Sequence, residues 1–220
     1  MKKKDDIVAY YPVSLKIAGR KCVVAGGGEV ALRKVKALLE HGADVEVISP
    51  DLCPEMVRLG ESGEISVHNH AYEMGNLAGA FLAIAATDDA ETNRQVTVEA
   101  RNKAILVNVV DDAENSDFIV PSYLSRDSLT IAVSTSGQSP ALARKIRTRL
   151  EKEITGQYGA LTRLIGEVRA EIKREEIKIE NDRWQEALDI DSLLELLKKG
   201  EREKAKALLL SRLKERQGKF

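Results

Sequence analysis

The chain has 220 residues and, with 34 Lys or Arg against 35 Asp or Glu, a formal net charge of -1, which argues against nonspecific attraction to nucleic acid or to a membrane surface. Its length accommodates one domain of moderate size and a smaller appendage, and no apolar run approaches the ~20 residues that a membrane-spanning helix requires. The first six residues lead into no apolar stretch and the two cysteines indicate reduced thiols, so we expect a cytoplasmic protein that binds neither nucleic acid nor membrane.

A strand, a glycine-rich turn and a helix are predicted for residues 22–39, where an apolar run enters an amphipathic segment. Gly26, Gly28 and Ala31 form the pattern G-x-G-x-x-A. The first glycine allows a turn with positive φ, the second has no Cβ to block a phosphate, and the alanine lets the helix pack closely on the strand. Backbone N–H groups and the helix dipole then favour an anion. The pattern indicates a dinucleotide site; the alternative is a glycine turn that binds nothing.

A second strand is predicted for residues 44–49, with Gly42 ending the helix before it and Pro50 ending the strand. Asp51 lies 23 residues after Gly28, close to where dinucleotide-binding folds place an acid on the adenine ribose. An acid in this place favours NAD over NADP. The alternative is that Asp51 caps a helix beginning near Pro54.

Three further strands are predicted, at residues 65–67, 80–86 and 104–110. Between the last two, Thr87 or Asp88 is placed to cap a helix that ends near Asn102. Strands that alternate with helices imply an α/β fold with a parallel, doubly wound, Rossmann-like sheet.

The carboxyl ends of these strands carry the candidate functional residues, because doubly wound sheets bind ligands along that edge. The residues at such ends are Gly26, Asp51, Thr87 and Asp111. Asp111 is the candidate acid or base, since its carboxylate would face the crevice beside the cofactor's reactive ring. The alternative is that Asp111 and Asp112 form a solvated turn.

From Asp117 the pattern changes to short strands, predicted at residues 118–121 and 129–133. A loop rich in hydroxyl groups follows, and Ser139 and Pro140 suit the N-cap and first position of a helix. That helix start and the basic residues behind it suit a ligand with several carboxylates. The alternative is a well-capped helix with a solvated basic face.

The rest of the chain is predicted to be helical. Apolar residues recur at helical spacing over residues 141–179, and a helix pair interrupted at Gly200 is predicted to run from Asp191 to Arg216. No metal site is expected, because His68 and His70 have no cysteine or carboxylate cluster beside them.

Five motifs occur in order along the chain. They are G-G-G-E-V-A-L-R-K-V at 26–35, A-I-A-A-T-D-D at 83–89, N-V-V-D-D at 108–112, D-F-I-V-P-S at 117–122 and S-T-S-G-Q-S-P-A-L-A-R-K-I-R at 134–147. Together they resemble the precorrin-2 dehydrogenase/sirohydrochlorin ferrochelatase family of sirohaem synthesis. The resemblance covers residues 7–150 in detail, whereas the helical tail matches in character more than in letters.

The resemblance implies an oxidoreductase that converts precorrin-2 to sirohydrochlorin with NAD as hydride acceptor and, in bifunctional members, inserts Fe²⁺ as a second substrate. It implies that Asp111 takes a proton and assists metal insertion. The expected cofactor-binding residues are Gly26, Gly27, Gly28, Glu29, Val30, Pro50, Asp51 and Thr87. The expected substrate-binding residues are Ser134, Thr135, Ser136, Gly137, Arg126 and Arg144, of which Thr135 falls where some members carry serine.

Three segments are therefore expected: an NAD-binding Rossmann domain at residues 1–113, a dimerisation and substrate segment at 114–145, and a helical domain at 146–220. The resemblance implies a homodimer formed through the small β element at residues 117–133. The rival function is a regulatory dinucleotide-binding module without catalysis, which would share the sheet and the glycine loop but would not need Asp111 or the hydroxyl-rich loop.

Overall fold

The computed structural model describes residues 10–215, so the first six residues, for which the sequence predicts no export signal, lie outside the described part. The chain forms two compact units that divide between Val120 and Pro121, and each unit has a hydrophobic core of its own. The expected three-segment organisation stays a proposal, since the β element and the C-terminal helices share the second unit. Among residues 10–215 no helix is long and apolar enough to cross a membrane.

The first unit is a five-stranded, fully parallel sheet in the order β3-β2-β1-β4-β5. Its strands are β1 (Lys21–Ala25), β2 (Asp44–Ile48), β3 (Ser66–His68), β4 (Leu82–Ala85) and β5 (Leu106–Val109). Its helices are α1 (Glu29–Glu40), α2 (Pro54–Glu61) and α3 (Ala90–Asn102). The predicted Rossmann-like sheet is confirmed, with strand ends that shift by one or two residues.

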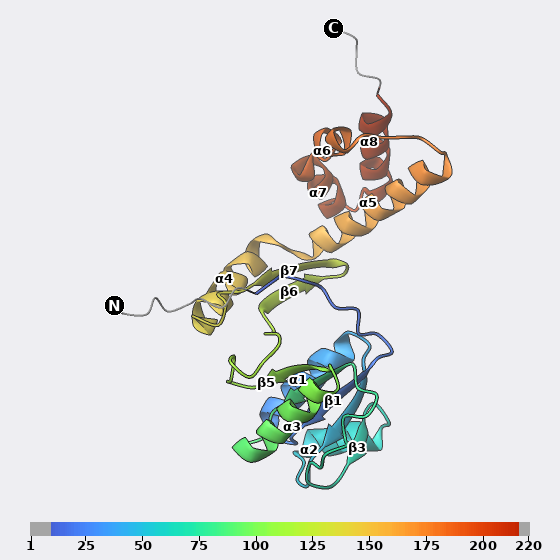
Figure 1. The fold of residues 1–220 in the computed structure, drawn as a ribbon. Coiled ribbons are helices and arrows are strands. Elements are labelled where there is room, and N and C mark those ends of the chain that lie inside the picture. Colours follow the sequence, from blue (N-terminus) through green and yellow to red (C-terminus); the bar gives the residue numbers. More distant parts are fainter. Residues whose placement is uncertain (1–9, 216–220) are drawn as a thin grey trace. The chain divides into compact units, whose positions relative to one another are not determined.

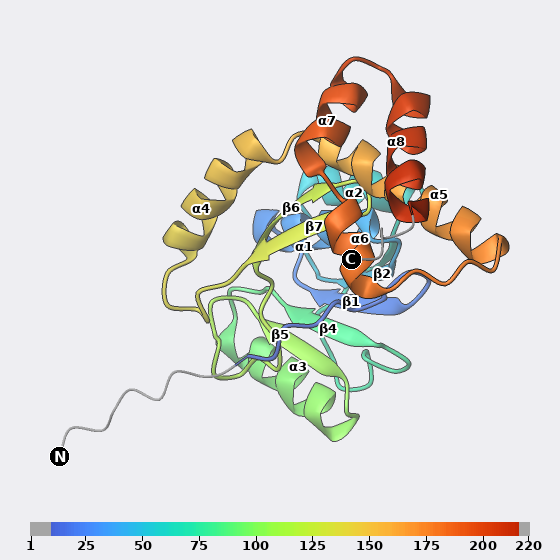
Figure 2. The same cartoon turned by 90° about the horizontal axis from the view of Figure 1, so that it is seen from above.

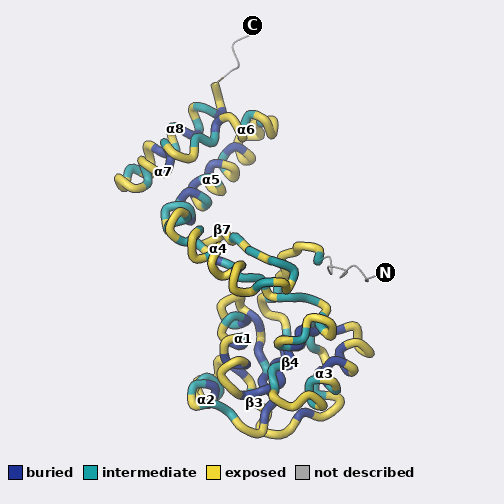
Figure 3. Tube along the Cα trace, turned by 90° about the vertical axis from the view of Figure 1, so that its left-hand side faces the viewer, coloured by how far each residue is buried: buried dark blue, intermediate teal, exposed yellow. Residues whose placement is uncertain are grey.

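Both faces of this sheet are covered, which explains the near-continuous apolar runs of its strands. Cys22 and Val24 of β1 pack with α1 and α2, whereas Val23 and Ala25 pack with α3. Figure 2 shows β2, β1, β4 and β5 in their order across the sheet, and Figure 3 shows the buried residues concentrated in the strands and on the inner sides of the helices. The carboxyl ends of all five strands therefore lie at one edge.

The second unit joins a hairpin to a group of helices (Figure 1). The antiparallel hairpin comprises β6 (Ser122–Arg126) and β7 (Leu129–Val133). The helices are α4 (Pro140–Glu153), α5 (Gly156–Arg174), α6 (Asn181–Ala187), α7 (Ile190–Lys198) and α8 (Arg202–Lys214). The apolar face of α5 packs against Leu193, Leu209 and Leu213, so its helical periodicity reflects burial.

The strand predicted at residues 118–121 is wrong. The backbone N–H of Asp117 donates to the carbonyl of Val107 at 2.8 Å, and Asn108 Nδ2 donates to the carbonyl of Phe118 at 3.0 Å. These bonds tie the segment to β5, and the hairpin begins only at Ser122. A side-chain bond to a carbonyl ten residues away leaves no signal in hydrophobic periodicity.

Two helix details also differ from the sequence prediction. Asp89, rather than Thr87 or Asp88, caps α3, because its side chain accepts the N–H groups of Glu91 and Thr92. The short helix α6 was not predicted as a separate element. Its Trp184 packs against the core of the second unit, which supports α6 by burial rather than by a side-chain cap.

The packing of α5 generates a stability prediction. A Cβ at Gly159 would lie 2.9 Å from the Arg126 backbone oxygen, whereas a Cβ at Gly166 on the same helix meets nothing within 4 Å. We expect Gly159→Ala to lower the free energy of unfolding by about 1–3 kcal/mol through overpacking. Gly166→Ala should raise it by up to ~1 kcal/mol, as alanine does in exposed helices.

Urea unfolding followed by fluorescence of Trp184, the single tryptophan, measures both variants in the unit that carries the substitutions. Equal shifts in the same direction would contradict the close approach of α5 to the hairpin.

Candidate functional site

The turn between β1 and α1 is fitted between the ends of two neighbouring strands. Gly26 has φ 122°, and its N–H donates to the carbonyl of Ile48, the last residue of β2, at 2.9 Å. A Cβ on Gly26 would overlap the carbonyl oxygen of Ala86 after β4, and one on Gly27 would overlap that of Asp51 after β2. Only glycine fits at both positions, because each backbone atom lies against another backbone.

Gly28 plays a different role from its two neighbours. It is the N-cap of α1 without a side-chain cap, and no atom lies within 4 Å of the position that its Cβ would take. The first intrahelical bond joins the N–H of Leu32 to the carbonyl of Gly28 at 2.9 Å. The backbone N–H groups before Leu32 have no intrahelical acceptor. Together with the positive end of the helix dipole, they lie at this open space. This arrangement fits a pyrophosphate.

A cavity of about 520 Å³ opens at this turn. It is lined by segments that follow β1, β2 and β4 and by part of the connection after β3. All eight predicted cofactor-binding residues line it: Gly26, Gly27, Gly28, Glu29, Val30, Pro50, Asp51 and Thr87. None of the described residues that line the cavity is Lys, Arg or His. An anion held there would rest on backbone N–H groups.

Asp51 lines the cavity and does not cap the next helix. The N-cap of α2 is Cys53, without a side-chain cap bond, and the backbone oxygen of Asp51 accepts the hydroxyl of Ser49 at 2.7 Å. The capping alternative raised by the sequence is therefore wrong. The Asp51 carboxylate remains exposed at the edge of the cavity.

Thr87 is held at the end of β4 by a side chain from α3. Its hydroxyl donates to Asn93 Oδ1 at 2.8 Å, and Asn93 Nδ2 donates back to the Thr87 carbonyl at 3.0 Å. Beside it, hydrogen bonds from the hydroxyl and N–H of Thr92 hold the pKa of Asp89 below its usual range. The cavity wall after β4 is thus anchored to the start of α3.

Asp111 follows β5 at the same edge of the sheet but does not line the cavity. Its φ of 60° places it in the left-handed region, which costs free energy for a residue other than glycine, asparagine or aspartate. The neighbouring Asp112 makes the turn bonds, since its carboxylate accepts the N–H of Asn115 at 3.1 Å and the amide of Asn115 at 2.7 Å. Asp111 is itself a central residue of a turn, in which the N–H of Asp112 donates to the Val109 carbonyl at 3.2 Å. The predicted turn is therefore present, and Asp112 makes its side-chain hydrogen bonds.

Lys34 on α1 is the basic group electrostatically coupled to Asp111. Burial lowers the pKa of the Lys34 ammonium, Arg33 lowers it further, and the Asp111 carboxylate acts in the opposite direction. The Asp111 carboxylate therefore favours the ionised form of Lys34.

The predicted substrate residues lie in the second unit. Ser139 caps α4 by accepting the N–H of Leu142 at 3.2 Å, with Pro140 in the first turn as predicted. The Thr135 hydroxyl accepts the N–H of Ser139 at 3.0 Å and the Ser134 hydroxyl that of Ser136 at 3.1 Å. These bonds order the hydroxyl-rich loop.

The two predicted arginines differ in their engagement. Arg126 donates to the carbonyls of Ile154 at 3.0 Å and Ser125 at 2.8 Å, so its guanidinium connects the hairpin to the end of α4. Arg144 is exposed on α4. Gly137, with φ 81°, completes the turn before the helix.

The two neighbouring histidines are exposed in the first unit. His68 Nε2 lies 3.3 Å from Glu46 Oε2, and the ring centroids of His68 and His70 are 6.1 Å apart. Within residues 10–215, no group of three or more His, Cys, Asp or Glu side chains is arranged to hold a metal ion.

Comparison with known families decides the relationship. Residues 13–122 match the family described as "Putative NAD(P)-binding", and residues 126–153 match "Sirohaem biosynthesis protein central". The chain belongs to the sirohaem synthase N-terminal family. The two matches cover, in order, the Rossmann-like unit and the segment from the end of β6 through β7 and α4.

Individual members of the family are similar over most of this chain. A siroheme synthase of Chromobacterium violaceum is 46% identical over 164 residues, covering 74% of this chain and 35% of that protein. A siroheme synthase of Methylobacillus flagellatus is 46% identical over 163 residues, again covering 74% of this chain and 35% of that protein. The chain thus spans about a third of the length of these relatives. A solved structure of SirC, a precorrin-2 dehydrogenase, superposes with a TM-score of 0.69 at 26% identity, covering 93% of this chain and 98% of that chain.

Sequence reasoning missed part of the cavity wall. Ser49 and Ala86 follow the ends of β2 and β4, so the strand-end rule could have included them. Ala71 and Tyr72 also line the cavity, but they belong to a connection without regular secondary structure. No periodic pattern marks such residues.

The open space at Gly28 generates a binding prediction. Gly28→Val places a branched side chain in the open space where the pyrophosphate would lie, at a backbone conformation that valine adopts freely. We expect dinucleotide affinity to fall by more than about tenfold, or 1.4 kcal/mol, with little change in stability. Isothermal titration with NAD and thermal melting measure the two quantities.

Gly27→Val is the matched contrast. Its side chain would overlap the Asp51 carbonyl and the Leu52 side chain, so it should lower the free energy of unfolding. Normal NAD affinity in a folded Gly28→Val protein would refute the proposed phosphate cradle.

Proposed function

We propose that this chain is an NAD-dependent precorrin-2 dehydrogenase that forms sirohydrochlorin in sirohaem biosynthesis. The observation that carries the proposal is the convergence of all eight expected cofactor-binding residues on one cavity, in a chain similar over 93% of its length to SirC, a precorrin-2 dehydrogenase. The siroheme synthases named above support the same pathway.

The cavity fits a dinucleotide, and its charges favour NAD. Gly28 leaves open space at the start of α1 for a pyrophosphate. Asp51 offers a carboxylate to the hydroxyls of an adenine ribose and would repel a 2′-phosphate. None of the described lining residues supplies a positive side chain for that phosphate. When bound, NAD⁺ supplies the hydride acceptor for the oxidation.

Asp111 is proposed as the catalytic base. Oxidation of precorrin-2 to sirohydrochlorin removes one hydride and one proton, so a proton acceptor is needed beside the hydride acceptor. Asp111 follows the carboxyl end of β5, and the side-chain hydrogen bonds to Asn115 in this segment are made by Asp112. The ammonium of Lys34 on α1 interacts electrostatically with this carboxylate.

The substrate carries eight carboxylates, which call for N–H donors and positive side chains. We propose that the loop at residues 134–137, the start of α4, Arg126 and Arg144 bind some of them. The hairpin β6–β7 is the proposed homodimer interface. Insertion of Fe²⁺ as a second substrate is proposed from the likeness to siroheme synthases.

An anaerobic absorbance assay tests the function. Precorrin-2 with NAD⁺ should give sirohydrochlorin and NADH, and NADP⁺ should give much slower turnover. Fe²⁺ added afterwards, against a control without enzyme, shows whether the chain also accelerates iron insertion. A folded protein that binds NAD but leaves precorrin-2 unchanged would instead support a regulatory dinucleotide-binding module.

Asp111→Asn is the sharpest variant for the proposed base. Asparagine tolerates the positive φ of this residue better than alanine does. A loss of activity in this variant would therefore not result from backbone strain. We expect turnover to fall by about 10²- to 10⁴-fold because the general base is removed. NAD affinity should stay unchanged, since Asp111 does not line the cavity.

Glu114→Gln, at an exposed residue of the same segment, is the control and should retain activity. Turnover at the wild-type rate in Asp111→Asn would remove this carboxylate from the mechanism.

A further inference from the structure

Glu99 of α3 is a buried carboxylate that accepts three of its four hydrogen bonds from outside its own helix. Only 1% of the residue is exposed. Its Oε2 accepts the hydroxyl of Tyr72 at 2.6 Å and the N–H of Gly75 at 2.8 Å. Its Oε1 accepts the N–H of Leu77 at 3.2 Å and Lys103 Nζ at 2.6 Å. Four donors therefore meet one side chain.

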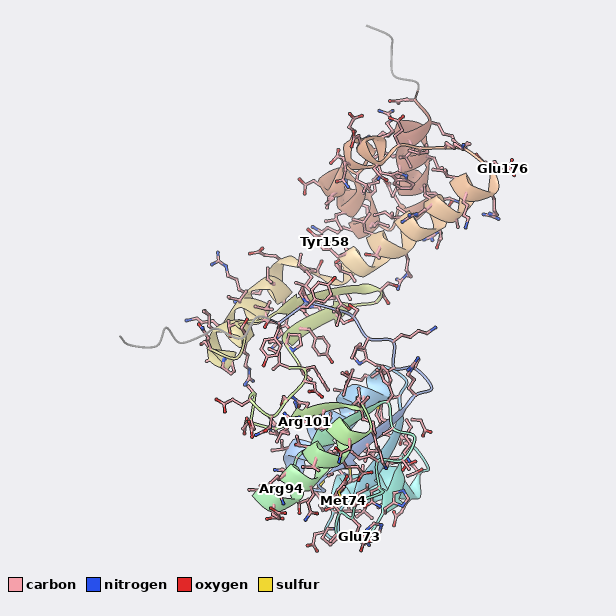
Figure 4. The ribbon with its side chains drawn as sticks, viewed as in Figure 1. Glu73, Met74, Arg94, Arg101, Tyr158 and Glu176 are labelled. Carbon is pink, nitrogen blue, oxygen red and sulfur yellow. The ribbon has the colours of Figure 1, made fainter. Side chains whose placement is uncertain are left out.

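Three of these donors belong to the connection between β3 and β4. This segment, residues 69–81, contains no helix or strand, so its backbone groups lack the partners that regular structure would give them. Leu77 is fully buried and Tyr72 is 8% exposed. Figure 4 marks Glu73 and Met74 of the connection and Arg94 and Arg101 of α3, the helix against which the connection lies. Without Glu99, the Tyr72 hydroxyl and the Leu77 N–H, which belong to buried residues, would lose this acceptor.

The same connection forms part of the candidate cofactor cavity. Ala71 and Tyr72 line it together with Asp51 and Gly28, whereas Glu99 does not. The Tyr72 hydroxyl bonded to Glu99 thus belongs to a residue that also forms cavity wall. The position of this wall depends on a carboxylate outside the cavity.

We infer that Glu99 is a positioning residue for cofactor binding, which acts by holding Ala71 and Tyr72 in the conformation that a bound dinucleotide requires. The inference rests on the proposed function of the cavity. A carboxylate offers acceptors to all four donors, whereas a glutamine amide turns an N–H₂ group toward two of them. The connection then occupies other conformations, and apparent affinity falls with the fraction of molecules that retain the competent one.

Glu99→Gln tests the inference in the full-length protein. We expect the Kd and the KM for NAD to rise by about tenfold through the lost preorganisation. The value of kcat at saturating NAD should stay within about twofold, because Glu99 acts on the cavity wall through Tyr72 and has no part in the proposed proton transfer. Amide hydrogen exchange should become faster at Gly75 or at Leu77, because the glutamine N–H₂ group replaces the oxygen that accepts one of these two N–H groups. Glu61→Gln, at an exposed residue of α2, is the matched control and should change none of these quantities.

Tyr72→Phe is a second and milder variant. It removes one donor to Glu99 but keeps the ring that lines the cavity, so we expect a smaller rise in the Kd for NAD with kcat unchanged. It serves as the deciding variant if Glu99→Gln does not fold, as judged by circular dichroism. A folded Glu99→Gln protein, or in its absence Tyr72→Phe, with wild-type Kd and KM would overturn the inference.

The wild-type protein separates this outcome from failure of the proposed function. If the wild-type protein binds NAD and the variants have the same Kd and KM for NAD, only the positioning role is refuted. Absence of NAD binding by the wild-type protein refutes the cofactor site and the positioning role together. A fall in kcat at saturating NAD, with Kd unchanged, would also overturn the inference, because it would place Glu99 in the chemical step.

Discussion

The close approach of the Gly26–Gly27 backbone to the ends of β2 and β4 is the constraint on which the candidate site depends. A side chain at either position would overlap a carbonyl oxygen of a neighbouring strand end. The two glycines let the turn after β1 fit between Asp51 and Ala86, and this places three strand ends around one cavity. Gly28 then directs the start of α1 at that space without filling it. Steric exclusion, more than any attractive contact, defines where a ligand can lie.

The first unit was largely predictable because its determinants are local in sequence. Parallel strands buried on both faces leave apolar runs, glycines mark the phosphate turn, and the strand-end rule brings Asp51 and Thr87 to the same edge. The cavity wall at Tyr72 was not predictable, since its position depends on Glu99, 27 residues later in the chain. The hydrogen bond from Asn108 to the Phe118 carbonyl, found where the sequence predicts a strand, likewise leaves no signal in hydrophobic periodicity.

In the second unit, periodicity predicted helical structure but not its breaks. Residues 141–179 appear uniformly amphipathic, yet α4 ends at Glu153 and α5 begins at Gly156. The carbonyl of Ile154 leaves the helical pattern and accepts Arg126 Nε instead, and the missing side chain of Gly159 lets α5 approach the backbone of the hairpin. A hydrogen bond to a residue 28 positions away thus helps to set a helix boundary, and no helix propensity encodes such a bond.

The separate cores of the two units affect how the stability of this protein responds to ligands. Each unit has its own buried cluster, and the chain divides between Val120 and Pro121. A ligand held only by residues of the first unit adds its binding free energy to the unfolding of that unit and leaves the intrinsic stability of the helical unit unchanged. A single melting temperature for the whole chain would then average two transitions with different ligand dependence. The cofactor concentration is therefore expected to separate the two unfolding transitions. Whether the first unit unfolds before or after the second would then depend on how much cofactor the cell contains.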